Sequence, residues 1–217
     1  MQRREFLRNS LVLGTTGLLM PMDAIASGFP GNKTVQLRLL QGEAAHCSRC
    51  QELANHRTQA VCGIGNPDAE IMFLGEAPGA NEDKQGEPFV GRAGQLLNEI
   101  ISEGLKLRRK DVYICNVLCC RPPKNRTPLP NEAANCRPFL DQALDIVKPK
   151  FICCLGAVVA QTLLGTTDTL QSLRGKVHNY NGISVVCTYH PASLLRNPDM
   201  KKEAWSDIQF LLKKMGR

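Results

Sequence analysis

Short apolar runs alternate along this chain with longer segments in which apolar residues recur at helical spacing. Four runs read as buried strands: EIMFLG (70–75), VYICNVL (112–118), FICCLG (151–156) and ISVVCTYH (183–190). Helical spacing follows in AGQLLNEIISEGL (93–105), EAANCRPFLDQALDIV (132–147), AVVAQTLLG (157–165) and a basic tail from Glu203. Strands separated by helices predict an α/β fold, a three-layer α/β/α sandwich with a central four-stranded, mainly parallel sheet.

The least ordinary residues follow the predicted strands. GEAPG comes after the first strand, Asn116 ends the second with RPP just beyond it, Gly156 follows the third, and His190 closes the fourth. Ligands of open parallel sheets bind outside the carboxyl ends of the strands. We therefore expect these loops to meet at one edge of the sheet and form the functional site.

The longest of these loops has an unusual composition. Residues 73–94, FLGEAPGANEDKQGEPFVGRAG, contain five glycines, two prolines and four carboxylates, with Phe89 as an isolated aromatic residue. So acidic a loop does not favour phosphate binding, although the chain carries a formal net charge of +7. The loop calls for a function that uses carboxylates and one flat apolar side chain together.

Length and composition describe an ordinary globular protein. The 217 residues suffice for one α/β domain with a real core, and 43% hydrophobic and 22% charged residues are typical values. The positive charge favours a polyanionic partner, although only weakly.

The N-terminus has a separate character. Residues 1–30 contain adjacent arginines, Arg3 and Arg4, then a short apolar run and Ala24-Ile25-Ala26, a pattern typical of a twin-arginine export signal with a small-residue cleavage site. The alternative is a disordered or mis-started N-terminus. The apolar run is too short to span a membrane. We place the functional domain at residues 40–217 and prefer a cytoplasmic location, with export as the alternative.

Ten cysteines are many for an intracellular enzyme of this size. Cysteines 115, 119, 153, 154 and 187 lie in strand-like runs and read as buried thiols. Cys47 and Cys50 form a CxxC pair in polar sequence, and Cys120 and Cys136 flank the RPP loop. Two such pairs could hold a tetrahedral zinc or a four-iron cluster, and spacing alone does not separate these metals.

Five motifs together resemble a known family. GEAPGANED, GEPFVGRAG, YICNV, CRPPKNRTP and HPASLLRN, in this order and spacing, resemble the type-4 uracil-DNA glycosylases from about Cys47 to the C-terminus. The resemblance implies hydrolysis of the N-glycosidic bond of deoxyuridine in single- or double-stranded DNA. It also implies a structural [4Fe–4S] cluster held by Cys47, Cys50, Cys120 and Cys136.

Three residues gain recognition roles from this resemblance. The target base must be flipped out of the DNA helix, and Phe89 offers an apolar face on which uracil can stack. The amide of Asn116 can donate and accept, which matches uracil O4 and N3–H and opposes the pattern of cytosine. A His190 N–H aimed at uracil O2 would stabilise the negative charge that bond cleavage creates. Without the family, each residue also has an ordinary structural explanation.

The acids of the long loop take the remaining chemistry. Glu76 is the first candidate to activate the attacking water or to stabilise an oxocarbenium-like sugar, and Asp83 is a second candidate. Type-1 enzymes carry an aspartate one position later, where this chain has Ala77 in the substrate-binding loop. Glu82 occupies the position that the resemblance assigns to exclusion of the thymine methyl group.

DNA contacts are expected from two loops. Ser193 and either Leu194 or Leu195 would enter the helix, with one leucine filling the space that the flipped base leaves. Four basic residues are expected to contact phosphates: Arg121, Lys124, Arg126 and Arg196. We expect a monomer.

Three other interpretations remain. A binding relative without catalysis is disfavoured by intact Glu76, Asn116 and His190, and a relative that links covalently to uracil-DNA through a histidine loop is disfavoured because RPPKNRTP lacks histidine. An exported metalloprotein of unrelated function is favoured by the N-terminus alone. These interpretations differ in whether the chain releases uracil from DNA.

Overall fold

A computed structural model describes residues 32–217 of the chain. The export signal expected at residues 1–30 lies outside the described residues. The first described helix, α1 (Lys33–Ala45), packs against α5 (Pro130–Val147) and buries Leu37 and Leu40. The folded domain therefore extends N-terminal of residue 40, where the sequence placed its start.

The centre of the domain is one six-stranded sheet with the order β1-β3-β2-β4-β6-β5. Its strands are β1 (Gly63–Gly65), β2 (Ile71–Gly75), β3 (Tyr113–Asn116), β4 (Phe151–Leu155), β5 (His178–Tyr180) and β6 (Ile183–Thr188). Strands β3, β2, β4 and β6 are mutually parallel, which confirms the predicted central sheet.

The predicted number of strands is wrong, because two edge strands escaped the sequence pattern. Strand β1 pairs antiparallel with β3, and β5 pairs antiparallel with β6. Each has three residues, GIG and HNY, so neither is long enough or apolar enough to show an alternation.

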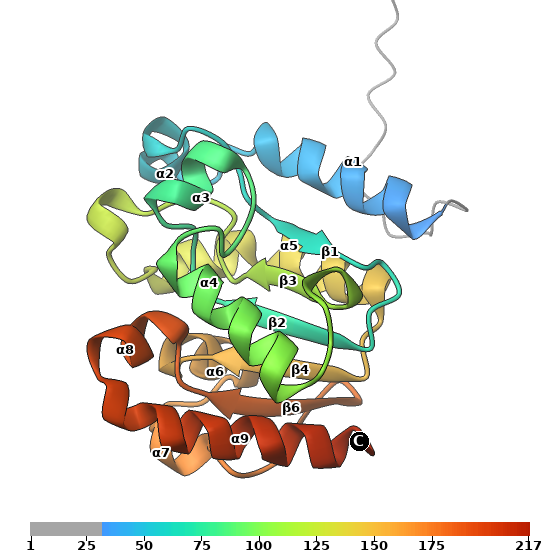
Figure 1. Cartoon of the computed structure of the whole chain (residues 1–217). Helices are drawn as coiled ribbons and strands as arrows, with labels where there is room; N and C mark the ends of the chain where they lie inside the picture. Colours follow the sequence, from blue (N-terminus) through green and yellow to red (C-terminus); the bar gives the residue numbers. More distant parts are fainter. Residues whose placement is uncertain (1–31) are drawn as a thin grey trace, which may run out of the picture. The chain divides into compact units, whose positions relative to one another are not determined.

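Helices complete two outer layers. The helices besides α1 and α5 are α2 (Gln51–His56), α3 (Ala80–Gln85), α4 (Arg92–Glu99), α6 (Ala157–Leu164), α7 (Leu170–Leu173), α8 (Pro191–Arg196) and α9 (Lys201–Lys214). A π-helical turn, Ile100–Gly104, extends α4. In Figure 1, α4 and α9 lie over one face of the sheet, with α5 and α6 behind it.

Strand alternation decides which side chains join each core. On β2, Met72 and Leu74 pack with α1, α5 and α6, whereas Ile71 and Phe73 pack with α4 and α9. Both sets are essentially inaccessible to solvent, as expected for a parallel sheet covered on two faces. The three-layer α/β/α arrangement predicted from the sequence is confirmed.

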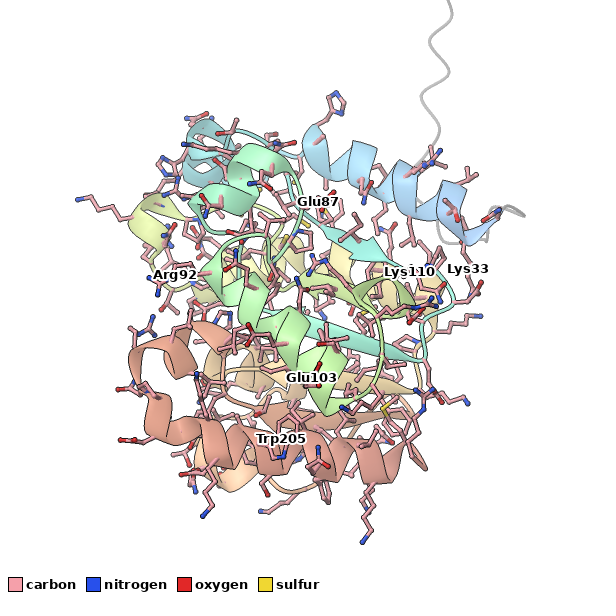
Figure 2. The ribbon with its side chains drawn as sticks, in the orientation of Figure 1. Lys33, Glu87, Arg92, Glu103, Lys110 and Trp205 are labelled. Atoms are coloured by element: carbon pink, nitrogen blue, oxygen red, sulfur yellow. The ribbon has the colours of Figure 1, made fainter. Side chains whose placement is uncertain are left out.

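Helix α9 carries an exposed aromatic side chain on the face shown in Figure 2. Trp205 of α9 projects there at 46% exposure, near Glu103 at the end of the π-helical turn. In the described part of the chain, none of the helices has the length and apolar character needed to cross a membrane.

Candidate active site

A cavity of about 420 Å³ opens at the carboxyl ends of β2 and β3, where the sequence placed the functional site. Its walls come from the loop after β2, the end of β3, the loop before α5 and the start of α8. Predicted site residues among its lining are Glu76, Ala77, Glu82, Phe89, Asn116, Arg126, His190, Ser193 and Arg196.

Gly75 makes room for two of these side chains at the end of β2. A Cβ atom at this position would lie 2.3 Å from Oδ1 of Asn116 and 2.6 Å from the ring of Phe89. Asn116 is only 4% exposed, yet within residues 32–217 no group hydrogen-bonds its amide. The amide lines the cavity, so its donor and acceptor groups are accessible from there.

Phe89 is held in an unusual backbone conformation. It has a φ of 55°, which non-glycine residues rarely adopt. Gly94 of α4 packs on its backbone so tightly that a Cβ there would lie 1.8 Å from the Phe89 carbonyl oxygen. The ring is thereby fixed at the cavity wall, with its centroid 5.6 Å from that of His190.

His190 caps the N-terminus of α8 with its own ring. The Ala192 N–H donates a hydrogen bond to His190 Nδ1 over 3.1 Å, so the proton of the neutral ring sits on Nε2. Burial, with a smaller contribution from Arg196, lowers the pKa of His190 to about 4. The cavity therefore receives a neutral imidazole whose Nε2–H is available as a donor.

Two carboxylates of the long loop reach the same cavity and differ in their hydrogen bonds. Burial raises the pKa of Glu76, and no group in residues 32–217 hydrogen-bonds its side chain. Glu82 Oε1 instead accepts hydrogen bonds from Val90 N–H (3.0 Å) and Gly91 N–H (2.9 Å). Glu82 thus ties down the backbone that follows Phe89, a contact that the sequence did not reveal.

The second candidate for water activation, Asp83, points away from the cavity. It is 2% exposed and accepts hydrogen bonds from the Thr58 N–H (2.8 Å) and the Thr58 hydroxyl (2.7 Å). Its carboxylate fastens α3 to the segment after α2, so the proposed catalytic role for Asp83 is wrong.

The residues of α8 divide by exposure. Leu194 is 2% exposed and buried in the core, so of the two leucines expected to enter DNA the structure favours Leu195. Leu195 is 37% exposed and is the one that projects from the helix. Arg196 is exposed, donates to Ser193 Oγ over 3.3 Å, and has no carboxylate within ion-pair distance among the described residues.

The basic residues of the loop before α5 also differ. Lys124 is exposed at a φ of 53°, and Arg121 Nε donates to Asn125 Oδ1 over 2.8 Å. Arg126 instead makes short ion pairs with Glu132 (2.7 Å) and Glu52 (2.8 Å). The positive charge of Arg126 is therefore already compensated.

The four predicted metal-binding cysteines come together at a second cavity. Cys47 and Cys50 precede α2, Cys120 follows β3 and Cys136 lies on α5, and all four line that cavity. None of the ten cysteines, all within the described chain, forms a disulfide. No three His, Cys, Asp or Glu side chains of residues 32–217 converge closely enough to hold a single metal ion.

Hydrogen-bond donors surround these sulfur atoms. Arg57 donates to Cys120 Sγ over 3.0 Å, Asn135 to Cys50 Sγ over 3.5 Å, and the Cys119 N–H to Cys136 Sγ over 3.3 Å. Such donors stabilise thiolates, which are the form of cysteine that binds metal. Cys119, read from the sequence as a strand residue, lies beyond β3 and lines this cavity instead.

Some residues that line the cavity at the ends of β2 and β3 had no sequence signal of their own. Asn125 and Thr127 line it from the loop before α5, and Ala93 from α4. The Gly-rich composition of residues 73–94 indicated close backbone approach, but not which glycine faces which side chain. Those pairings depend on contacts between distant segments.

Comparisons with known proteins agree with the motifs. The sequence model of the uracil DNA glycosylase superfamily matches residues 62–209. The chain is 43% identical over 183 residues to a type-4 uracil-DNA glycosylase of Archaeoglobus fulgidus, covering 81% of this chain and 91% of that one. Enzymes of the same name from Sulfurisphaera tokodaii (44% over 181 residues, 80% of this chain and 82% of that one) and Thermotoga maritima (44% over 177 residues, 80% and 91%) are similar.

Proposed function

The chain belongs to the uracil DNA glycosylase superfamily, and we propose that it hydrolyses the N-glycosidic bond of deoxyuridine in DNA, releasing uracil and leaving an abasic site. The observation that carries this proposal is the unpaired Asn116 amide beside the Phe89 ring and the His190 imidazole in one cavity. For a flat heterocycle, the amide can hydrogen-bond the edge of the base, the phenyl ring can stack on its face, and the imidazole can donate an N–H.

Uracil binding follows from these positions. A flipped uracil would stack on Phe89 while Asn116 donates to O4 and accepts from N3–H. Cytosine presents a donor and an acceptor in the opposite order, so a fixed Asn116 amide would reject it. The Asn116 amide occupies the space that Gly75 leaves by lacking a Cβ, so its position depends on this glycine.

Bond cleavage places negative charge on uracil N1 and O2. The His190 Nε2–H, fixed by the Ala192 N–H at Nδ1, is suited to donate to O2 as this charge develops. A pKa near 4 keeps the ring neutral at physiological pH, so it stabilises the anion as a hydrogen-bond donor without transferring a proton.

Water attack is assigned to Glu76. Its carboxylate has no protein hydrogen bond among residues 32–217 and lies in the cavity, where it can orient a water or stabilise positive charge on the sugar. The neighbouring Ala77 cannot perform either role. Glu82 lies close enough to the cavity to exclude a 5-methyl group while it holds Val90 and Gly91.

DNA would approach the rim formed by α8 and the loop before α5. Leu195 is the exposed residue that can fill the vacated base stack, with Ser193 beside it. Arg196, Arg121 and Lys124 lack carboxylate partners in the described chain and are assigned to phosphates.

The cysteine cavity fits a [4Fe–4S] cluster. Four thiols line it and hydrogen-bond donors face three of them, as the thiolate ligands of a cluster require. Cys47, Cys50, Cys120 and Cys136 would hold the cluster. When bound, it would cross-link the segment before α2, the end of the β3 loop and α5.

A strand-cleavage assay tests the proposal. A fluorescent oligonucleotide with one deoxyuridine is incubated with cluster-loaded protein and then treated with alkali, comparing wild type with His190→Ala. We expect uracil-dependent cleavage that falls at least tenfold in the variant, about 1.4 kcal/mol of transition-state stabilisation. No cleavage by loaded wild-type protein would refute the enzyme and leave a binding relative.

A further inference from the structure

Arg126 stands between the two cavities. Its side chain lines the substrate cavity, while its partner Glu132 lines the cysteine cavity. The guanidinium spans Glu132 in two hydrogen bonds, Nη2 to Oε1 (2.7 Å) and Nη1 to Oε2 (2.9 Å), and reaches Glu52 over 2.8 Å. Among the described residues, no other ion pair joins a residue that lines one cavity to a residue that lines the other.

Both partners of Arg126 lie close in sequence to a cysteine of the proposed set. Glu52 is on α2, two positions after Cys50, and Glu132 is on the first turn of α5, four positions before Cys136. Glu132 is 4% exposed and also accepts from the Leu129 N–H over 2.8 Å, so its carboxylate is fixed. The Arg126 ion pairs therefore anchor the loop before α5 to the walls of the cysteine cavity.

This loop needs an anchor because of its backbone. Lys124 and Asn125 are consecutive residues at φ values of 53° and 54°, a left-handed conformation that side-chain-bearing residues rarely adopt. Asn125, Arg126 and Thr127 from this stretch line the substrate cavity. Hydrogen bonds within the turn and the Arg126 ion pairs together hold this wall in place.

The charge around Arg126 argues against a phosphate contact. Two carboxylates bracket one guanidinium, so the trio carries a net negative charge, whereas Arg196 lines the same cavity without a carboxylate partner among residues 32–217. Releasing Arg126 to DNA would leave the buried Glu132 carboxylate uncompensated.

We propose that Arg126 is a positioning residue that holds the cavity wall at Asn125–Thr127 through Glu52 and Glu132, coupling the cysteine site to substrate affinity without contacting DNA. The inference rests on the proposed function, because it concerns affinity for DNA at that site. It replaces the phosphate contact that was expected for Arg126 from the sequence.

Salt dependence separates a positioning role from a phosphate contact. Binding of a fluorescent duplex carrying a tetrahydrofuran abasic-site analogue is measured over a range of KCl for the loaded wild type, Arg126→Gln and Arg196→Gln. Loss of one phosphate contact lowers the slope of log K against log salt by about 0.9. We expect that loss in Arg196→Gln, whereas Arg126→Gln should weaken binding roughly 5- to 30-fold at every salt concentration with the slope unchanged.

Two further measurements report on the loop before α5 that forms this part of the cavity wall. The amides of residues 125 and 126 donate to the carbonyls of Pro122 and Pro123, and their hydrogen exchange should accelerate at least about tenfold in Arg126→Gln and stay unchanged in Arg196→Gln. In steady-state cleavage of deoxyuridine DNA, Arg126→Gln should raise KM by a larger factor than it lowers kcat.

Glu52→Gln is a second variant that tests the same contact if Arg126→Gln fails to fold. The Glu52 side chain is 63% exposed, so its replacement should leave the fold intact and reproduce the loop exchange change with smaller size. The double variant should bind no more weakly than Arg126→Gln alone, because both act through one contact. A reduced salt slope in Arg126→Gln, with unchanged loop exchange in both variants, would overturn the proposal.

The proposed function and this inference fail separately. Binding and exchange are measured without turnover, so they report on Arg126 even in a protein that does not cleave. Absence of uracil release by wild type would refute the enzyme, whereas a salt slope reduced in Arg126→Gln as far as in Arg196→Gln would refute the positioning role alone.

Discussion

The rings of Phe89 and His190 lie with their centroids 5.6 Å apart and their planes tilted by 32°. One ring comes from the loop after β2 and the other from the residue that starts α8, so the sheet edge brings them together. Glycines at the ends of β2 and β4 leave room for the two rings. A Cβ on Gly75 would lie 2.6 Å from the Phe89 ring, and one on Gly156 would lie 3.3 Å from His190 Cβ.

Gly75→Ala should disable the cavity. The added methyl would lie 2.3 Å from Asn116 Oδ1, so we expect at least a roughly 100-fold loss of kcat/KM and a fall of about 1–3 kcal/mol in the free energy of unfolding. Gly42→Ala in α1 is the matched control, because nothing lies within 4 Å of its added methyl. The control should gain about 0.5–1 kcal/mol and keep its activity; normal turnover by Gly75→Ala would contradict the geometry.

Asn116→Asp should change base selection. An aspartate at this position loses the donor for uracil O4 and can accept from the cytosine amino group. We expect kcat/KM for uracil to fall about 100-fold and the cytosine-to-uracil ratio of kcat/KM to rise at least tenfold. Parallel assays on oligonucleotides with one uracil or one cytosine measure both. An unchanged ratio would show that another group reads the base.

His190 should make the stability of the domain depend on pH. Burial lowers its folded pKa from 6.5 to about 4, so the unfolded chain binds this proton more tightly. The free energy of unfolding should therefore decrease as the pH falls from 6.5 to 4, by up to about 3 kcal/mol. Urea denaturation of His190→Gln should lack this contribution, whereas the exposed-residue control His56→Gln should keep the wild-type slope.

Glu76 should control the acid limb of activity. Burial raises its pKa above 4.5, so the carboxylate becomes protonated, and activity declines, at a higher pH than for an exposed glutamate. Glu76→Gln should abolish this limb and lower kcat at least about 100-fold. Single-turnover rates across the pH range measure both effects, with the exposed Glu99→Gln on α4 as the control. A persisting limb in Glu76→Gln would assign the ionisation elsewhere.

Cys136→Ala should lose iron, whereas Cys119→Ala should retain it. Both side chains line the cysteine cavity and both are buried, but only Cys136 belongs to the proposed set of four. The Cys119 backbone N–H, which donates to Cys136 Sγ, survives its own substitution. Iron and sulfide per chain, together with visible absorption, give the comparison. Iron retained by Cys136→Ala but lost by Cys119→Ala would reassign the ligand.

The sequence alone determined the central sheet and the location of the site. Buried strands of a parallel sheet are continuous apolar runs, and the residues that interrupt this pattern, such as Asn116 and His190, mark the strand ends where ligands bind. These are local signals, because a strand's apolar character and its final residue are both readable within a few positions.

Only the tertiary structure decided which side chains are available. Leu194 and Leu195 are neighbours in sequence, yet packing on α4 buries one and leaves the other exposed. Asp83 turns to Thr58, and Arg126 turns to Glu52 and Glu132, because long-range hydrogen bonds satisfy their charges. Burial and partner choice depend on segments far apart in the chain, and no local pattern of residues contains that information.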